Sequence, residues 1–122
     1  MSDKKHVLKD KSFAFALRCI SLYKHLNENK KEFVISKQLL RSGTSVGANI
    51  REAQNAESKA DFIHKLAIAQ KECDETIYWL ELLYESEFII NSEFEALNNE
   101  ANQILKMLRS SILTTKQKSH YS

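Results

Sequence analysis

The chain lacks proline altogether and has only two glycines among its 122 residues. Proline and glycine mark most tight turns, so strands joined by hairpins at short, regular spacing are disfavoured. Cysteine is also scarce, and Cys19 and Cys73 stand apart from each other and from any Cys/His cluster. We therefore expect two small core residues, and we expect neither a disulfide nor a metal site.

Long hydrophobic runs are missing as well. No apolar run approaches the roughly 20 residues that a membrane-spanning helix needs. The lysine-containing start, MSDKKHVLKDK, is not followed by the apolar stretch and cleavage site of a secretion signal. These absences predict a cytoplasmic protein with no membrane partner. The formal net charge of +2 is too small to imply a polyanionic partner, so such a partner must be argued from the distribution of the charges.

The apolar residues follow a helical period along most of the chain. Their spacing predicts four helices, at residues 11–28, 34–57, 59–86 and 93–115. The connections are short, which favours antiparallel neighbours. We therefore expect one domain, residues 1–122, with an all-α, up-down-up-down four-helix bundle.

Two of the predicted helices carry apolar residues on opposite sides. In the first helix, Phe13, Leu17 and Ile20 lie opposite a second apolar stripe. In the third helix, Ile68, Trp79 and Leu82 lie opposite the main stripe that begins at Phe62. A second apolar face needs a second partner, so these residues predict a homo-oligomer.

Both glycines fall inside the second predicted helix, in SGTSVGANIREA at residues 42–53. Each costs about 1 kcal/mol relative to alanine, so a Gly43/Gly47 strip indicates that another helix approaches closely, within or between subunits. We include both glycines among the candidate oligomer contacts. A phosphate-binding loop is disfavoured because no strand precedes the glycines and no Gly-Lys-Ser/Thr follows them.

A longer block around these glycines resembles a known family. Residues 42–83, SGTSVGANIREAQNAESKADFIHKLAIAQKECDETIYWLELL, resemble the signature of four-helix-bundle proteins encoded in intervening sequences of bacterial 23S ribosomal RNA genes. This resemblance implies an all-α bundle that assembles as a ring-like homopentamer. The family is similar to the accessory variability determinant of diversity-generating retroelements, a pentamer with a basic surface that binds nucleic acid and a reverse transcriptase. No catalytic residue is carried over.

The cations are arranged in two ways that suit a polyanion. One is a stripe on the outer side of the second helix, formed by Lys37, Arg41 and Arg51. The other arises because basic residues come early in the third helix and late in the fourth. In an antiparallel bundle these residues lie at one end, and they are Lys59, Lys65, Lys106, Arg109 and Lys116.

A positive end that is repeated around a ring would bind a phosphate backbone in a salt-sensitive, mainly sequence-independent way. The sequence therefore predicts a non-catalytic, oligomeric binding module whose partner is RNA or DNA. The alternative is a structural ring that recruits a protein such as a reverse transcriptase. The alternative for the stripe is an ordinary solvated helix face, and the alternative for the basic end is contact between oppositely charged ends of neighbouring molecules. No aromatic residue is interleaved with the basic run, so base stacking has little support.

Enzyme functions have weaker support. Arg18 and His25 have a spacing that resembles the Arg-x(4–6)-His motif of the helical HEPN-type ribonucleases, which is a minor alternative. A ferritin-like di-iron site needs two Glu-x-x-His pairs, whereas this chain has Asp61 and His64 at that spacing only once. We expect no catalytic residues and no cofactor.

Overall fold

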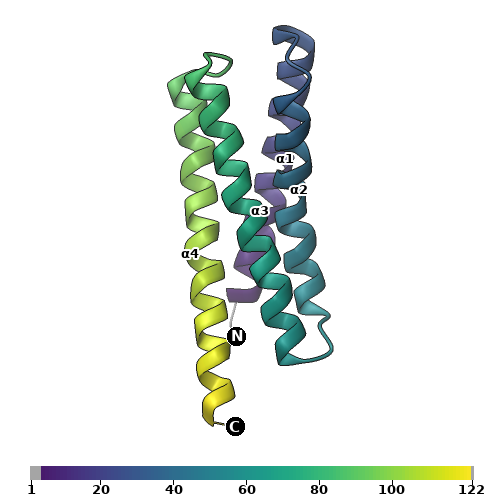
Figure 1. The fold of residues 1–122 in the computed structure, drawn as a ribbon, viewed down its shortest axis with the longest axis vertical. Coiled ribbons are helices and arrows are strands. Elements are labelled where there is room, and N and C mark those ends of the chain that lie inside the picture. The colour runs from purple at the N-terminus through teal and green to yellow at the C-terminus, as the bar shows by residue number, and fades with distance from the viewer. Residues whose placement is uncertain (1–3, 122) are drawn as a thin grey trace.

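The computed structural model describes the backbone of residues 4–121 and the side chains of residues 6–118. Its four helices are α1 (Lys4–Lys30), α2 (Ile35–Gln54), α3 (Lys59–Glu85) and α4 (Asn91–Tyr121). No strand occurs among the described residues. The helices run alternately up and down, and each packs against its neighbours in chain order (Figure 1). The predicted all-α, four-helix architecture is therefore confirmed.

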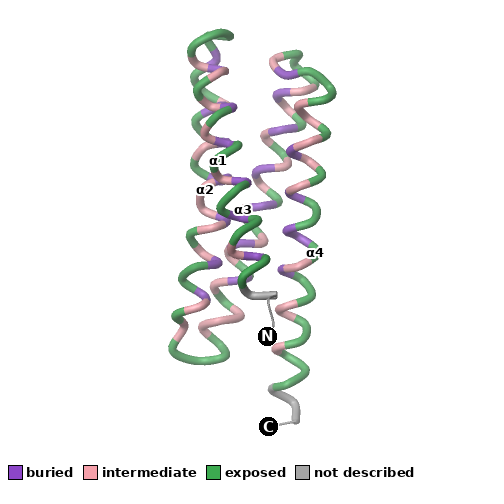
Figure 2. The backbone as a smooth tube through the Cα atoms, turned by 180° about the vertical axis from the view of Figure 1, so that it is seen from behind, coloured by how far each residue is buried: buried purple, intermediate pink, exposed green. Residues whose placement is uncertain are grey.

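The core runs the length of the bundle along the facing sides of the helices (Figure 2). In α2, the apolar residues Leu39, Val46 and Ile50 lie on one side of the helix and are buried. The buried polar residues Ser42 and Thr76 satisfy each other, because the Thr76 hydroxyl donates to the Ser42 hydroxyl at 2.8 Å. A periodic apolar face is thus enough to fix the orientation of α2.

Three helices, α1, α2 and α4, have bounds that differ from the prediction by two residues or more. α1 begins seven residues earlier than expected, and Leu8, which is only 5% exposed, fixes these early turns to the core. α2 ends at Gln54, where Asn55 caps it through backbone bonds. α4 begins at Asn91 and extends to Tyr121, and the Glu93 carboxylate accepts from the Ile90 N–H at 3.0 Å. The Glu93 carboxylate thus caps the start of α4.

The α1–α2 and α3–α4 connections lie at the same end of the bundle, the upper end in Figure 1, and both turn without glycine. Lys31 and Glu87 adopt positive φ angles of 55° and 69°. After α1, the Glu32 side chain folds back over the first turn of α2, and its oxygens accept from the N–H groups of Ile35 at 2.9 Å and Ser36 at 2.7 Å. A carboxylate at this position offsets the unpaired N–H groups and the positive end of the helix dipole.

Candidate nucleic-acid interface

The lower half of the bundle in Figure 1, called the basic end below, gathers cations from α2, α3 and α4, and among them Lys106 lies at the middle of α4. The last turns of α4 project past the α2–α3 connection (Figure 1), so its late residues share this end with the close of α2 and the start of α3. The exposed cations there are Arg51, Lys59, Lys106, Arg109 and Lys116. Within the described part of the chain, no carboxylate forms an ion pair with Arg51, Lys106, Arg109 or Lys116. Their charge is available to an anionic partner.

A reciprocal cap fixes the start of α3 at this end. The Ser58 hydroxyl accepts from the Asp61 N–H at 3.0 Å, and the Asp61 carboxylate accepts from the Glu57 N–H at 3.3 Å. The spacing Ser-x-x-Asp is a capping-box signal that the sequence reading missed. The cap orders the turn that carries Lys59.

Lys65 differs from the other cations of this end. Its ammonium donates to the Glu52 carboxylate at 2.8 Å, and this hydrogen bond raises the pKa of Lys65. Its charge is matched within the chain, so Lys65 contributes less than its neighbours to a positive surface.

The predicted stripe on α2 does not form one continuous cationic surface. Arg41 pairs with Glu72 at 3.2 Å and also with Glu75. The Trp79 indole N–H donates to Glu75 at 3.0 Å, and together with the Arg41 contact it holds the pKa of Glu75 below its ordinary value. Arg41 is neutralised in the middle of the stripe. Lys37 is exposed but lies 14 residues before Arg51, about 21 Å along the helix.

The two glycines face α1 of the same chain. A Cβ on Gly43 would lie 2.5 Å from Cys19 Sγ, and a Cβ on Gly47 would lie 3.3 Å from Ser12 Oγ. The close helix approach that the strip indicated is thus the α1–α2 contact within one subunit.

The apolar surface is larger on α1 than on α3. Ile68, Trp79 and Leu82 are half-buried, and Trp79 packs against the core. On α1, by contrast, Phe13 and Leu17 are 55% and 53% exposed. The strongest candidate contact for a second copy is therefore the exposed face of α1 that carries Phe13 and Leu17.

Arg18 and His25 line one cavity between α1 and α4, of about 350 Å³. Arg18 forms an ion pair with Glu100 of α4. The His25 ring Nδ1 lies 2.7 Å from the Asn29 amide nitrogen. The two residues thus share a cavity, and each already has a polar neighbour.

The cysteine side chains are fully buried. Burial raises the pKa of Cys19 and of Cys73 to about 12, so both thiols stay protonated and unreactive near neutral pH. Among the described side chains, no group of three or more His, Cys, Asp or Glu residues is placed to hold a metal ion. None of the helices in the described region is long and apolar enough to cross a membrane.

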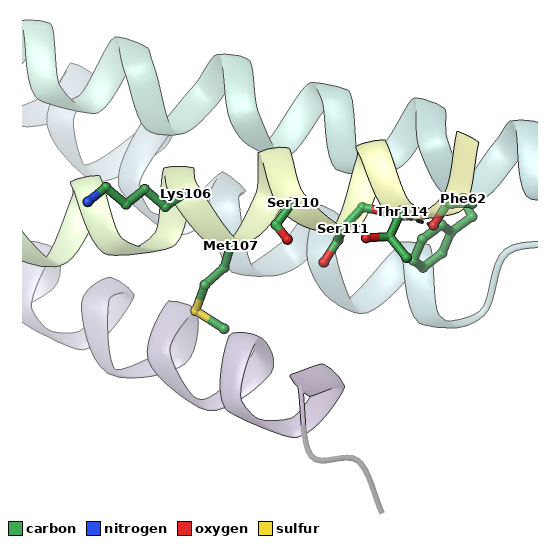
Figure 3. Close-up of a pocket in the computed structure, with 7 residues that line it drawn as sticks. Phe62, Lys106, Met107, Ser110, Ser111 and Thr114 are labelled. Carbon is green, nitrogen blue, oxygen red and sulfur yellow. Dashed lines mark hydrogen bonds between the residues drawn. The ribbon is translucent and has the colours of Figure 1, made fainter. Parts of the chain in front are cut away.

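A groove at the basic end was not foreseen from the sequence. It encloses about 320 Å³ on α4 and is lined by Lys106, Met107 and a row of hydroxyl side chains, with Phe62 of α3 at one end (Figure 3). Helical periodicity assigned Phe62 to the core, but the structure leaves it half-buried. Its position becomes clear only when α4 is placed beside α3.

Fold and surface together define an all-α four-helix protein with one strongly basic end. The family model of the 23S rRNA-intervening sequence protein matches residues 4–110, and the chain belongs to this family.

A solved structure is closely similar. A crystal structure of a protein of unknown function from the S23 ribosomal protein family, from Bacteroides thetaiotaomicron VPI-5482, matches with a TM-score of 0.88 and 58% identity. The match covers 89% of this chain and 97% of that chain. No curated protein matches the sequence significantly.

Proposed function

We propose that this protein is a non-catalytic, oligomeric module of the cytoplasm that binds RNA or DNA through its basic end. The observation that carries the proposal is a group of exposed cations on α2 and α4 that form no ion pair with any described residue, namely Arg51, Lys106, Arg109 and Lys116. Cations of this kind release condensed counterions from a phosphate backbone, which favours binding with little dependence on sequence. Lys37, Arg41 and Lys65 contribute less to this proposed surface. Lys37 is distant from the other cations, and Arg41 and Lys65 already form ion pairs within the chain.

Assembly is the second part of the proposal. A ring, with five subunits by the family resemblance, would bury the face of α1 that carries Phe13 and Leu17. Apolar patches of this kind usually mark interfaces. Repetition of a weak basic site around a ring would raise its avidity for a long polyanion without any new contact.

The test is a fluorescence-anisotropy titration with single-stranded and duplex RNA and DNA at about 50 mM and about 200 mM salt. We expect affinity to fall steeply with salt. The double variant Lys106→Glu/Arg109→Glu should weaken binding to all sequences and reduce the slope of log affinity against log salt by about 2. The matched control is Lys24→Glu/Lys30→Glu, which reverses two exposed cations at the opposite end. Equal losses in both variants would contradict a site at the basic end.

Light scattering on the same samples tests assembly. Phe13→Ser/Leu17→Ser should lower the solution mass without changing the helical content. Wild-type mass in this variant would exclude the α1 face as the contact.

A protein partner is the second candidate. The end opposite to the basic one carries the exposed apolar side chains of Val34 (74%) and Ile90 (65%), which favour a protein contact there. If an intact oligomer binds no nucleic acid at about 50 mM salt, the nucleic-acid proposal fails and this candidate is preferred. A ribonuclease function of Arg18 and His25 has less support, because Arg18 is already paired with Glu100.

A further inference from the structure

The groove at the basic end combines four features that suit one kind of ligand. Phe62 presents a half-buried aromatic side chain, and Lys106 lies at the other end of the groove (Figure 3). Between them, α4 contributes Met107 and the hydroxyls of Ser110, Ser111 and Thr114. From Lys106 to Thr114 the groove extends over eight residues, about 12 Å along the helix axis.

We propose that this groove binds an unpaired nucleotide, with its base against Phe62 and its phosphate directed along the row of hydroxyls toward Lys106. The inference rests on the proposed function and makes it specific, because it predicts a preference for single-stranded or unpaired nucleic acid over duplex. Aromatic side chains stack on bases of any type, since every base has a π-face. A paired base within a duplex has both faces covered by its neighbours and cannot stack in this way.

Three hydroxyls of the groove, those of Ser110, Ser111 and Thr114, are available to a ligand. Among the described residues, those of Ser110, Ser111 and Thr114 have no hydrogen-bond partner in the protein. Only the Thr115 hydroxyl donates back to the helix, to the Ser111 carbonyl at 2.8 Å. A hydroxyl both donates and accepts, so this row can satisfy the polar edge of any base.

The size and charge of the groove favour a nucleotide over other ligands. Its volume of about 320 Å³ is near the lower limit for small-molecule sites, which suits a single nucleotide and excludes a duplex. An uncharged apolar ligand would gain nothing from Lys106 or from the exposed cations nearby. The neighbouring cavity of about 90 Å³, which shares Phe62 and Ser111, indicates that the Phe62 ring is loosely packed on the core side. A substitution of Phe62 should therefore leave the fold intact.

The first experiment uses the wild-type protein with ¹³C-labelled methionine methyl groups. Of the two methionines in the chain, Met107 lies in the groove, so its methyl resonance reports directly on a bound ligand. Titration with adenosine 5′-monophosphate should shift the Met107 methyl resonance in a saturable way. Ribose 5-phosphate, which lacks the base, should produce a much smaller shift. A Met107 resonance that does not respond, or that responds equally to both compounds, overturns the proposal.

The second experiment compares variants in the anisotropy assay. Phe62→Leu should lower the affinity for single-stranded RNA about ten-fold at fixed salt and leave duplex affinity unchanged, whereas Phe62→Tyr should retain wild-type affinity. Phe33→Leu, the same change at an exposed phenylalanine at the opposite end, is the matched control and should have no effect.

The outcomes separate the two proposals. Equal losses of single-stranded and duplex affinity in Phe62→Leu would refute the groove. Salt-sensitive RNA binding that depends on Lys106 and Arg109, without any response of Met107 to the nucleotide, would refute the groove and keep the basic end. No binding of any nucleic acid by the intact oligomer would refute both.

Discussion

The glycine strip of α2 gives a sharp test of the packing, because its two members face different atoms of α1. A Cβ on Gly43 would lie 2.5 Å from Cys19 Sγ and 3.0 Å from Cys19 Cβ. Cβ atoms in real structures do not come so close to other heavy atoms, so Gly43→Ala must displace Cys19 or move α1 away. Cys19 is 0% exposed and has little space to move into. At Gly47 the nearest atoms are Ser12 Oγ at 3.3 Å and Ser12 O at 3.4 Å, which a small shift accommodates.

Two opposing terms set the size of the effect. Replacement of a helical glycine by alanine stabilises the helix by about 1 kcal/mol at either position. At Gly43, overpacking of the core opposes this by about 1–3 kcal/mol. We therefore expect Gly43→Ala to lower the free energy of unfolding by up to about 2 kcal/mol. Gly47→Ala, the matched control, should raise it by as much as about 1 kcal/mol.

The assay is urea unfolding followed by circular dichroism, with the protein concentration held constant because association affects stability. Removal of the sulfur in Gly43→Ala/Cys19→Ala should make the pair less destabilising than the sum of the single changes. If Gly43→Ala is as stable as Gly47→Ala, the close approach of α1 and α2 at Cys19 is refuted.

Three further predictions concern single side chains. Burial alone would raise the pKa of the Glu32 carboxyl, but the N–H groups it accepts from at the start of α2 outweigh burial and lower it. Its contribution to stability is therefore complete above the ordinary glutamate pKa and is lost as the pH falls through the lowered value. Glu32→Gln should remove this part of the acid dependence in urea midpoints measured against pH, and an unchanged profile would contradict the cap. Glu87→Gly should raise the free energy of unfolding by about 1 kcal/mol, because glycine adopts the φ of 69° without strain, and a loss would argue against this turn. Neither Cys19 nor Cys73 should react with a thiol reagent until urea is added, and fast labelling of the native protein would refute their burial.

Periodicity within one helix was enough to predict most of the core. Leu39, Val46 and Ile50 lie on one side of α2 because their spacing puts them there, whatever helix they contact. Periodicity did not predict the start of α1, because its first turns contain few apolar residues. These turns depend on Leu8 for their contact with the core.

Relations between helices could not be predicted in this way. A helical wheel shows Arg41 as a solvent-exposed cation, but its partners Glu72 and Glu75 are on α3. Phe62 belongs to the apolar stripe of α3, but it lies near the end of the bundle, where α4 presents Ser111 and Thr114 to it instead of a large apolar side chain. Contacts between two helices produce both features. The α2–α3 contact neutralises Arg41 at the centre of the stripe, and the α3–α4 contact forms the groove.

The charge separation between the two ends bears on the proposed assembly of subunits. α3 ends without a basic residue in its last turn, and the exposed carboxylates of Glu81, Glu85 and Glu95 lie at the same end of the bundle, opposite the basic one. This order opposes the dipole of α3, so it does not serve the stability of that helix. Local rules are most often broken at functional sites, which is consistent with a partner for the basic end.

In the proposed ring, the relative direction of neighbouring subunits determines whether this charge separation strengthens the binding of a polyanion. Antiparallel neighbours would place each basic end beside an acidic end and cancel the field of both. Neighbours that point the same way would gather all basic ends on one rim, where a long polyanion contacts several of them at once. In that arrangement Phe13→Ser/Leu17→Ser, which leaves every cation in place, should lower the affinity for long RNA much more than the affinity for a short oligonucleotide. Equal effects on both lengths would mean that each subunit binds alone and that the ring adds nothing to recognition.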